Sequence, residues 1–180
     1  ITYQPEIMDL TKTRTFTAKN RTNLVTVNNL LVPGEYRPKP FDSQEFTILC
    51  EKLKEARQNH RPVVCFFGAH VIKCGLSNYL LWFVKNGYIT HLAGNGACSI
   101  HDFELAYLGG TSEHVPTAIE DGTFGMWEET GRWMNEAVIA GASQNYGYGE
   151  SLAHYIDEHP NQFPYRDHCV FYQAYLHGVP

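Results

Sequence analysis

The sequence lacks any long apolar run and any excess of positive charge. No stretch approaches the roughly 18 uninterrupted apolar residues of a membrane-spanning helix, and residues 1–4 do not resemble a signal peptide. The 14 lysines and arginines are scattered and outnumbered by 19 acidic residues, which gives a net charge of -5. We therefore expect neither a membrane nor nucleic acid as a partner, because this chain offers no apolar span and no basic surface.

Cysteine and histidine are present, but without the spacings of disulfide or metal sites. The five cysteines are odd in number, form no Cys-x-x-Cys pair and mostly lie in apolar runs. This usage is typical of reduced core thiols and predicts a cytoplasmic protein. The nine histidines form no His-x-His, His-x-x-x-His or His-Glu-x-x-His pattern, so we expect no metal site.

The composition is that of one globular domain with an N-terminal extension. The chain has 180 residues, of which 43% are apolar and 18% are charged, so it can bury a core. Residues 1–40 hold four of the nine prolines and one short strand pattern at 24–28. We interpret residues 1–40 as an extended arm that packs on a neighbouring subunit, and residues 41–180 as the folded domain.

A helix is predicted over residues 42–59. Its first residues, Asp-Ser-Gln-Glu at 42–45, resemble a capping box, and Phe46, Leu49, Cys50 and Leu53 recur at helical spacing. The Arg-Pro pair at 61–62 ends the pattern.

Two apolar runs typical of strands buried on both faces follow this helix. Each run precedes a glycine-containing loop and then a helical pattern. The strands are expected at 63–67 and 88–93, the loops at 68–75 and 94–97, and the helices at 76–86 and 99–108. Further helices are expected at 133–140 and 167–176, with a loop at 141–149. This order predicts an α/β fold, a parallel sheet flanked by helices.

The two loops are expected to form one binding site. Both follow the carboxyl ends of neighbouring parallel strands, where ligands of open α/β sheets bind. Gly94, Gly96 and Ala97 let backbone amides approach a ligand, and a helix capped by Ser99 offers N–H groups to a phosphate or carboxylate. The alternative is that the small residues serve only tight packing of the turn.

Several polar residues fall in or just after these loops: His70, Lys73, Asn95, His101 and Asp102. Titratable groups that converge on one cleft are typical of a functional site. For Asp102 the structural alternative is a favourable charge in the first turn of a helix, and for Lys73 it is a solvated loop cation.

The segment from Gly68 to Glu104 resembles the NAD-binding core of deoxyhypusine synthase, in which a loop, a helix, a strand and a small-residue turn follow at this spacing. Gly-Tyr-Ile at 87–89, Ala-Gly-Asn-Gly at 93–96 and His-Asp-Phe-Glu at 101–104 are closer to a bacterial and archaeal group named lysine-oxoglutarate reductase/saccharopine dehydrogenase bifunctional-like. Some of its members convert ornithine to proline with NAD. The likeness continues more loosely through 124–131.

This resemblance implies a Rossmann-like fold, bound NAD and a homotetramer. It places the cofactor contacts on residues of the two loops: Gly68, Ala69, His70, Lys73, Gly94, Asn95, Gly96 and Ala97. The chain has Ala69-His70 where the synthase has Ser-Asn, and His101 where it has a glutamate. A cationic polyamine loses a counter-charge there, which favours an amino-acid-like or otherwise anionic substrate.

The expected function is an NAD-dependent enzyme that acts on a small amine or amino acid through an imine. It would be a transferase like deoxyhypusine synthase or a lyase like ornithine cyclodeaminase, with His101, Asp102 and Glu128 as candidate catalytic residues. Favourable charge at a helix N-terminus is the alternative for Glu128.

Two features leave a second function open. The synthase's late nucleophilic lysine has no match here, and a sheet of two or three strands would leave an edge unpaired, so we expect the chain to be part of a longer protein or to be completed by a partner. A non-catalytic nucleotide-binding or scaffold protein is the alternative.

Overall fold

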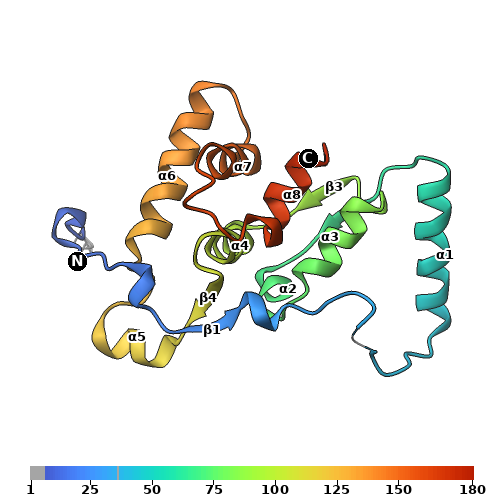
Figure 1. The fold of residues 1–180 in the computed structure, drawn as a ribbon, viewed down its shortest axis with the longest axis horizontal. Coiled ribbons are helices and arrows are strands. Elements are labelled where there is room, and N and C mark those ends of the chain that lie inside the picture. Colours follow the sequence, from blue (N-terminus) through green and yellow to red (C-terminus); the bar gives the residue numbers. More distant parts are fainter. Residues whose placement is uncertain (1–6, 36) are drawn as a thin grey trace, which may run out of the picture.

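The computed structural model describes residues 7–35 and 37–180, and in them it shows an α/β fold of eight α-helices and four short strands (Figure 1). The helices are α1 (Gln44–Gln58), α2 (Ala69–Lys73), α3 (Ser77–Lys85), α4 (Gly96–Leu108), α5 (Val115–Asp121), α6 (Glu128–Ser143), α7 (Tyr148–Glu158) and α8 (Val170–Leu176). Short 3-10 turns lie at Leu10–Lys12, Ala18–Asn20, Val27–Asn29 and Arg166–His168. No helix of this part of the chain is long and apolar enough to cross a membrane.

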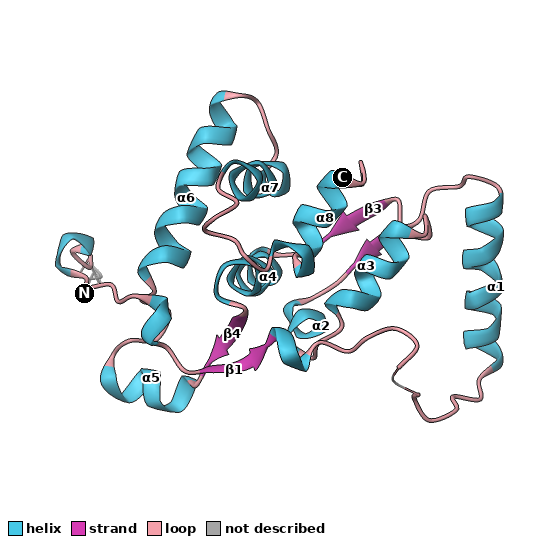
Figure 2. Cartoon of the chain, in the orientation of Figure 1, coloured by secondary structure: helices cyan, strands magenta, loops and turns pink. Residues whose placement is uncertain are grey.

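The strands form two separate pairs instead of one sheet (Figure 2). Strands β2 (Val64–Phe66) and β3 (His91–Ala93) are parallel, with Cys65 opposite Leu92. Strands β1 (Asn23–Thr26) and β4 (Gly110–Glu113) are antiparallel, with Val25 opposite Thr111. The predicted α/β class and the parallel pairing are confirmed, but the described residues contribute only two strands to the parallel sheet.

The expectation that both parallel strands are buried on both faces was wrong. Val64 and Phe66 point to solvent, and Phe66 is 80% exposed. Cys65 and Leu92 instead pack against the apolar cluster that includes Ile72, Leu81 and other residues of the neighbouring helices. Helices cover one face of this pair only, so alternate side chains of β2 remain exposed.

Helix α4 lies at the centre of the molecule, between two apolar cores (Figure 1). Phe103 packs edge-to-face on Phe163, with ring centroids 4.9 Å apart, in the core shared with α6 and α7. Leu105 belongs to the other core, with α3 and the start of α8. A helix buried on several sides needs apolar residues around its circumference, which is why its sequence shows little amphipathic pattern.

Helix α1 confirms the predicted helix over 42–59, and the oxygen of Ser43 caps it by accepting the amide of Phe46. Its apolar stripe is not buried, however, because α1 stands apart at one end of the molecule (Figure 1). Its last turn is held by Arg57, which donates to the carbonyl of Asn86 and lies over the ring of Tyr88.

Part of the predicted N-terminal arm belongs to the body of this chain. Ala18 is fully buried in the core of α4, α6 and α7. Phe16 exchanges backbone hydrogen bonds with Met126 and Glu128, and residues 23–26 pair with β4. The proline content of residues 1–40 indicated an extended segment, but the contacts of residues 16–26 with the rest of the chain determine where this segment lies.

Two predicted loops are shorter than expected. The loop at 68–75 contains α2, which begins after Gly68, and the loop at 141–149 is reduced to residues 144–147 between α6 and α7. Gly141 lies inside α6, where any larger residue would place its Cβ against the side chain of Ser151 in α7. The predicted helix at 167–176 is divided at Cys169 into a 3-10 turn and α8.

Candidate functional site

The N-terminus of α4 lies just beyond the carboxyl end of β3, as the two-loop pattern predicted. Asn95 is its cap, since its side-chain oxygen accepts the amide of Cys98 at 3.1 Å. The prediction that Ser99 caps the helix was wrong: Ser99 is buried in the first turn and donates to the carbonyl of Gly96. Asn95 directly precedes the first helical residue, where a side-chain oxygen can accept a free amide of the first turn, whereas Ser99 already lies within that turn.

Gly94 and Gly96 have different structural roles. A Cβ on Gly94 would lie 2.9 Å from the ring of Phe171 and 3.1 Å from Cys98, so this glycine permits close packing. A Cβ on Gly96 would meet nothing within 4 Å. Backbone at Gly96 is therefore open to a ligand, whereas Gly94 fits the packing alternative.

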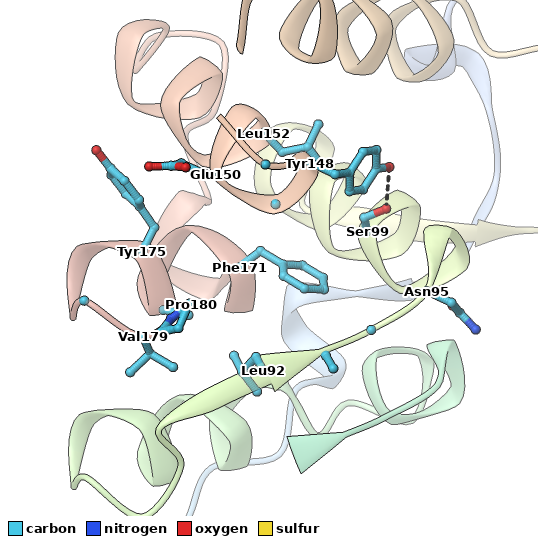
Figure 3. Close-up of a pocket in the computed structure, with 16 residues that line it drawn as sticks. Leu92, Asn95, Ser99, Tyr148, Glu150, Leu152, Phe171, Tyr175, Val179 and Pro180 are labelled. Carbon is cyan, nitrogen blue, oxygen red and sulfur yellow. Dashed lines mark hydrogen bonds between the residues drawn. The ribbon is translucent and has the colours of Figure 1, made fainter. Parts of the chain in front are cut away.

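One cavity of about 660 Å³ lies between β3, the start of α7 and α8 (Figure 3). Gly94 and Asn95 line it, together with Phe171, whose ring points into the cavity, and Tyr148. The hydroxyl groups of Tyr148 and Ser99 are hydrogen-bonded at 2.8 Å. Its volume is in the range of small-molecule sites, and its walls are mainly apolar.

A second cavity of about 560 Å³ lies on the other side of the α4 N-terminus. Lys73, Gly96 and His101 line it, and Tyr148 lines both cavities. The second cavity also receives Arg21 and Glu104, which the sequence pattern did not single out. It is the more highly charged of the two, because Arg21, Lys73, Glu104 and Glu113 line it, whereas Glu150 is the one charged residue of the first lining.

The predicted site residues are thus divided between two cavities. Gly94 and Asn95 reach the first, whereas Lys73, Gly96 and His101 reach the second. Six others line neither of these two cavities: Gly68, Ala69, His70, Ala97, Asp102 and Glu128. Among them His70 lies close enough to His101 to influence its pKa.

Asp102 is fully buried and holds the start of α8. Its carboxylate accepts the amides of Val170 and Phe171, both at 2.9 Å, and the thiol of Cys169 at 3.0 Å. Burial raises the pKa of Asp102 to about 6, although these donors lower it in part. These contacts favour the structural alternative, with the difference that Asp102 caps α8 and not its own helix.

Glu128 lies at the exposed N-terminus of α6, outside the linings of both cavities. It accepts a hydrogen bond from Thr15 and forms an ion pair with Arg132 at 2.9 Å, one turn further along the helix. The neighbouring Glu129 accepts the amide of Ala18 at 2.8 Å. This geometry agrees with a charge that stabilises a helix N-terminus.

Arg21 and Glu104 form a buried ion pair at the wall of the second cavity. Two parallel hydrogen bonds of 2.8 and 2.7 Å join the guanidinium to the carboxylate, and the side chains are 4% and 3% exposed. Glu104 also accepts the hydroxyls of Thr111 and Thr130, at 2.6 and 3.0 Å. A glutamate within the apolar stretch Phe-Glu-Leu-Ala at 103–106 was the sequence signal that could have indicated this pair.

His101 lies beside this ion pair, with its Nδ1 atom 2.7 Å from the hydroxyl of Thr111. Burial lowers the pKa of His101 below its usual 6.5, and Lys73, Arg21 and His70 add to this decrease while Glu104 opposes it. The neutral imidazole is therefore the favoured form near pH 7. A neutral histidine in a cavity can accept a proton.

Comparisons with protein-family models, with curated proteins and with solved structures found no match for this chain. Among residues 7–35 and 37–180, no three His, Cys, Asp or Glu side chains lie close enough together to hold a metal ion.

Proposed function

We propose that the chain is an NAD-dependent enzyme of the deoxyhypusine synthase-like family, acting on an amine-bearing substrate in the second cavity. The observation that carries this proposal is the position of His101 in a cavity that Lys73 and Gly96 also line, where burial lowers the pKa of its ring. The parallel pair β2 and β3 with the helices between them supports a Rossmann-like unit, because it is the strand–helix–strand element of such sheets.

The residues at the α4 N-terminus fit a dinucleotide. The first amides of a helix lack carbonyl partners within it, and the open space at Gly96 lets a phosphate approach them. Asn95 on one side and Lys73 on the other supply a polar group and a positive charge. Two cavities that meet at Tyr148 suit the two halves of a ligand longer than either of them.

When bound, NAD would supply the acceptor for the hydride that leaves the amine-bearing carbon. The chain's own residues would handle protons and orientation. His101 would accept a proton from the substrate ammonium group, which must be neutral before its carbon can lose hydride. Lys73 would receive an anionic group of the substrate or cofactor.

The charges of the second cavity favour an amino-acid-like substrate over a polyamine. The charge of Glu104 is met by Arg21, and Glu113, the other carboxylate of the lining, accepts the indole N–H of Trp127 at 2.9 Å and the amide of Gly125 at 3.1 Å, so both carboxylates are engaged within the protein. Of the described cations that line the cavity, Lys73 has no ion-pair partner within 4.0 Å and can meet a carboxylate. We also propose that the protein forms a homotetramer, as the resemblance to deoxyhypusine synthase implies. The free cysteines support a cytoplasmic location.

Cofactor binding is tested by thermal unfolding with and without millimolar NAD. Binding to the folded state should raise the melting temperature, and Gly96→Val should abolish the rise by filling the space at the α4 N-terminus. Ala142→Val, at an exposed helical position away from both cavities, is the matched control and should keep the rise. An unchanged melting temperature in the folded wild type would argue against NAD.

The substrate is tested by following NADH absorbance with ornithine or with spermidine. The charges predict turnover of ornithine and little turnover of spermidine. Substantial turnover of spermidine by the wild type would show that the positive charge of Lys73 and the lack of a carboxylate at position 101 do not select the substrate. Because the hydride returns in both reactions, NADH is expected as a transient species, and product formation is measured beside it. Neither transient NADH nor product with either amine would leave binding without catalysis, the alternative function.

A further inference from the structure

One buried side chain links the ion pair to the partly buried His101. Thr111 lies in the middle: its hydroxyl oxygen is 2.6 Å from Oε2 of Glu104 and 2.7 Å from Nδ1 of His101. Thr111 is fully buried on β4, opposite Val25. A valine would fill a buried strand position of this shape as well, so the hydroxyl must be explained by its hydrogen bonds.

The carboxylate of Glu104 determines which way the Thr111 hydroxyl points. Each of its oxygens accepts two hydrogen bonds, one from Arg21 and one from a threonine, Thr130 at Oε1 and Thr111 at Oε2. An ionised carboxylate has no proton to give and can only accept. The single proton of the Thr111 hydroxyl therefore lies toward Glu104.

The orientation of the Thr111 hydroxyl determines which ring nitrogen of His101 carries the hydrogen. Because the Thr111 proton is used, the hydroxyl oxygen can only accept from the imidazole 2.7 Å away. Nδ1 must carry a hydrogen, and in the neutral ring Nε2 then has a free lone pair. This nitrogen is the one that can act as a base.

We propose that Thr111 is a positioning residue, which transmits the fixed orientation of the Glu104–Arg21 pair to His101 and keeps its Nε2 atom unprotonated. The catalytic consequence rests on the function proposed above, but the tautomer itself does not. When Nε2 takes a proton from the substrate ammonium group, the ring becomes a cation whose Nδ1–H still donates to Thr111. The hydrogen bond then involves a charged donor, which strengthens it and stabilises the protonated ring.

The tautomer can be observed without substrate by nitrogen-15 NMR of the histidine rings in the complete chain, above the pKa of His101. The His101 signal is identified by its absence in His101→Gln. We expect Nδ1–H in the wild type and in Thr111→Ser, which keeps the hydroxyl, and a shift to Nε2–H or to a mixture in Thr111→Val. A wild-type ring protonated at Nε2 would overturn the proposal, whatever the variants do.

Turnover provides the second measurement. Thr111→Val should lower kcat by about 10²–10⁴-fold, the range that a positioned base contributes, with a much smaller change in KM. Thr111→Ser should restore most of the rate. Equal rates in wild type and a folded Thr111→Val would overturn the positioning role. Absence of turnover in the wild type, with the Nδ1–H tautomer observed, would contradict the proposed function and leave the tautomer assignment standing.

Discussion

The guanidinium of Arg21 and the carboxylate of Glu104 form two parallel hydrogen bonds across 83 positions of the sequence. The pair joins the N-terminal segment to the central helix α4 beside the candidate site. Two charges removed from water in this way depend on each other, because either one alone would be buried without a counter-charge.

Replacement of Arg21 by methionine should reduce the free energy of unfolding by about 3–5 kcal/mol, because Glu104 is left buried without its counter-charge. Urea unfolding followed by circular dichroism measures this change. Arg21→Met combined with Glu104→Met should lose much less than the sum of the two single changes. Arg14→Met, at an exposed position, is the control, and a loss as large as that of Arg21→Met would contradict the assignment.

Asp102→Ala should lower the free energy of unfolding by about 1–3 kcal/mol for each amide that it leaves buried without an acceptor. These are the amides of Val170 and Phe171 at the start of α8. Asp167→Ala, an exposed aspartate shortly before that helix, should change stability by less than about 0.5 kcal/mol. Equal effects of the two changes in urea unfolding would show that Asp102 is not the cap.

The protonation of His101 should occur at a lower pH than that of an ordinary histidine. Burial lowers its pKa below 6.5, and Lys73, Arg21 and His70 add to this decrease, against the opposing effect of Glu104. A base must be neutral, so activity should rise with pH through this lowered pKa and be constant above it. As pH falls below 6.5, the unfolded chain takes up the His101 proton before the folded chain does, so His101 lowers the free energy of unfolding at acid pH. Above pH 6.5 the histidine is neutral in both states, and this destabilisation disappears.

The variant Lys73→Met tests whether Lys73 lowers the pKa of His101. Removal of a cation that lowers the pKa of His101 should raise that pKa toward 6.5, as measured by the ring proton chemical shifts of His101 during titration. Lys85→Met, an exposed lysine at the end of α3, should leave the titration unchanged. An unchanged midpoint in Lys73→Met would show that the charge lies too far away to act.

Two glycines of α6 should respond to alanine in opposite directions. At Gly141 a new Cβ would collide with the side chain of Ser151, so Gly141→Ala should be destabilising by about 1–3 kcal/mol through overpacking between α6 and α7. At Gly131 it would meet nothing within 4 Å, and alanine should stabilise the helix by about 0.5–1 kcal/mol. Thermal unfolding of both variants measures the difference, and the same sign in both would contradict the packing.

The position of several helices followed from local pattern. The spacing of Phe46, Leu49 and Leu53 predicted α1. The helix predicted at 76–86 is α3, and Gly87 follows its end with the positive φ of 68° that glycine tolerates. Pattern could not show which apolar faces become buried. The stripe of α1 and alternate residues of β2 are exposed, because burial depends on what packs against an element.

The candidate site shows the same division. Residue types and their order along the chain determined by themselves that a strand, a tight turn and a helix would bring Asn95, Gly96 and His101 to one end of α4, since each step depends on neighbours in sequence. Only the tertiary structure decided that Gly94 serves packing, that Asp102 caps α8, and that Arg21, Glu104 and Thr111 surround His101. These contacts join residues between 7 and 83 positions apart, and their geometry depends on how β4, α8 and the N-terminal segment pack on α4.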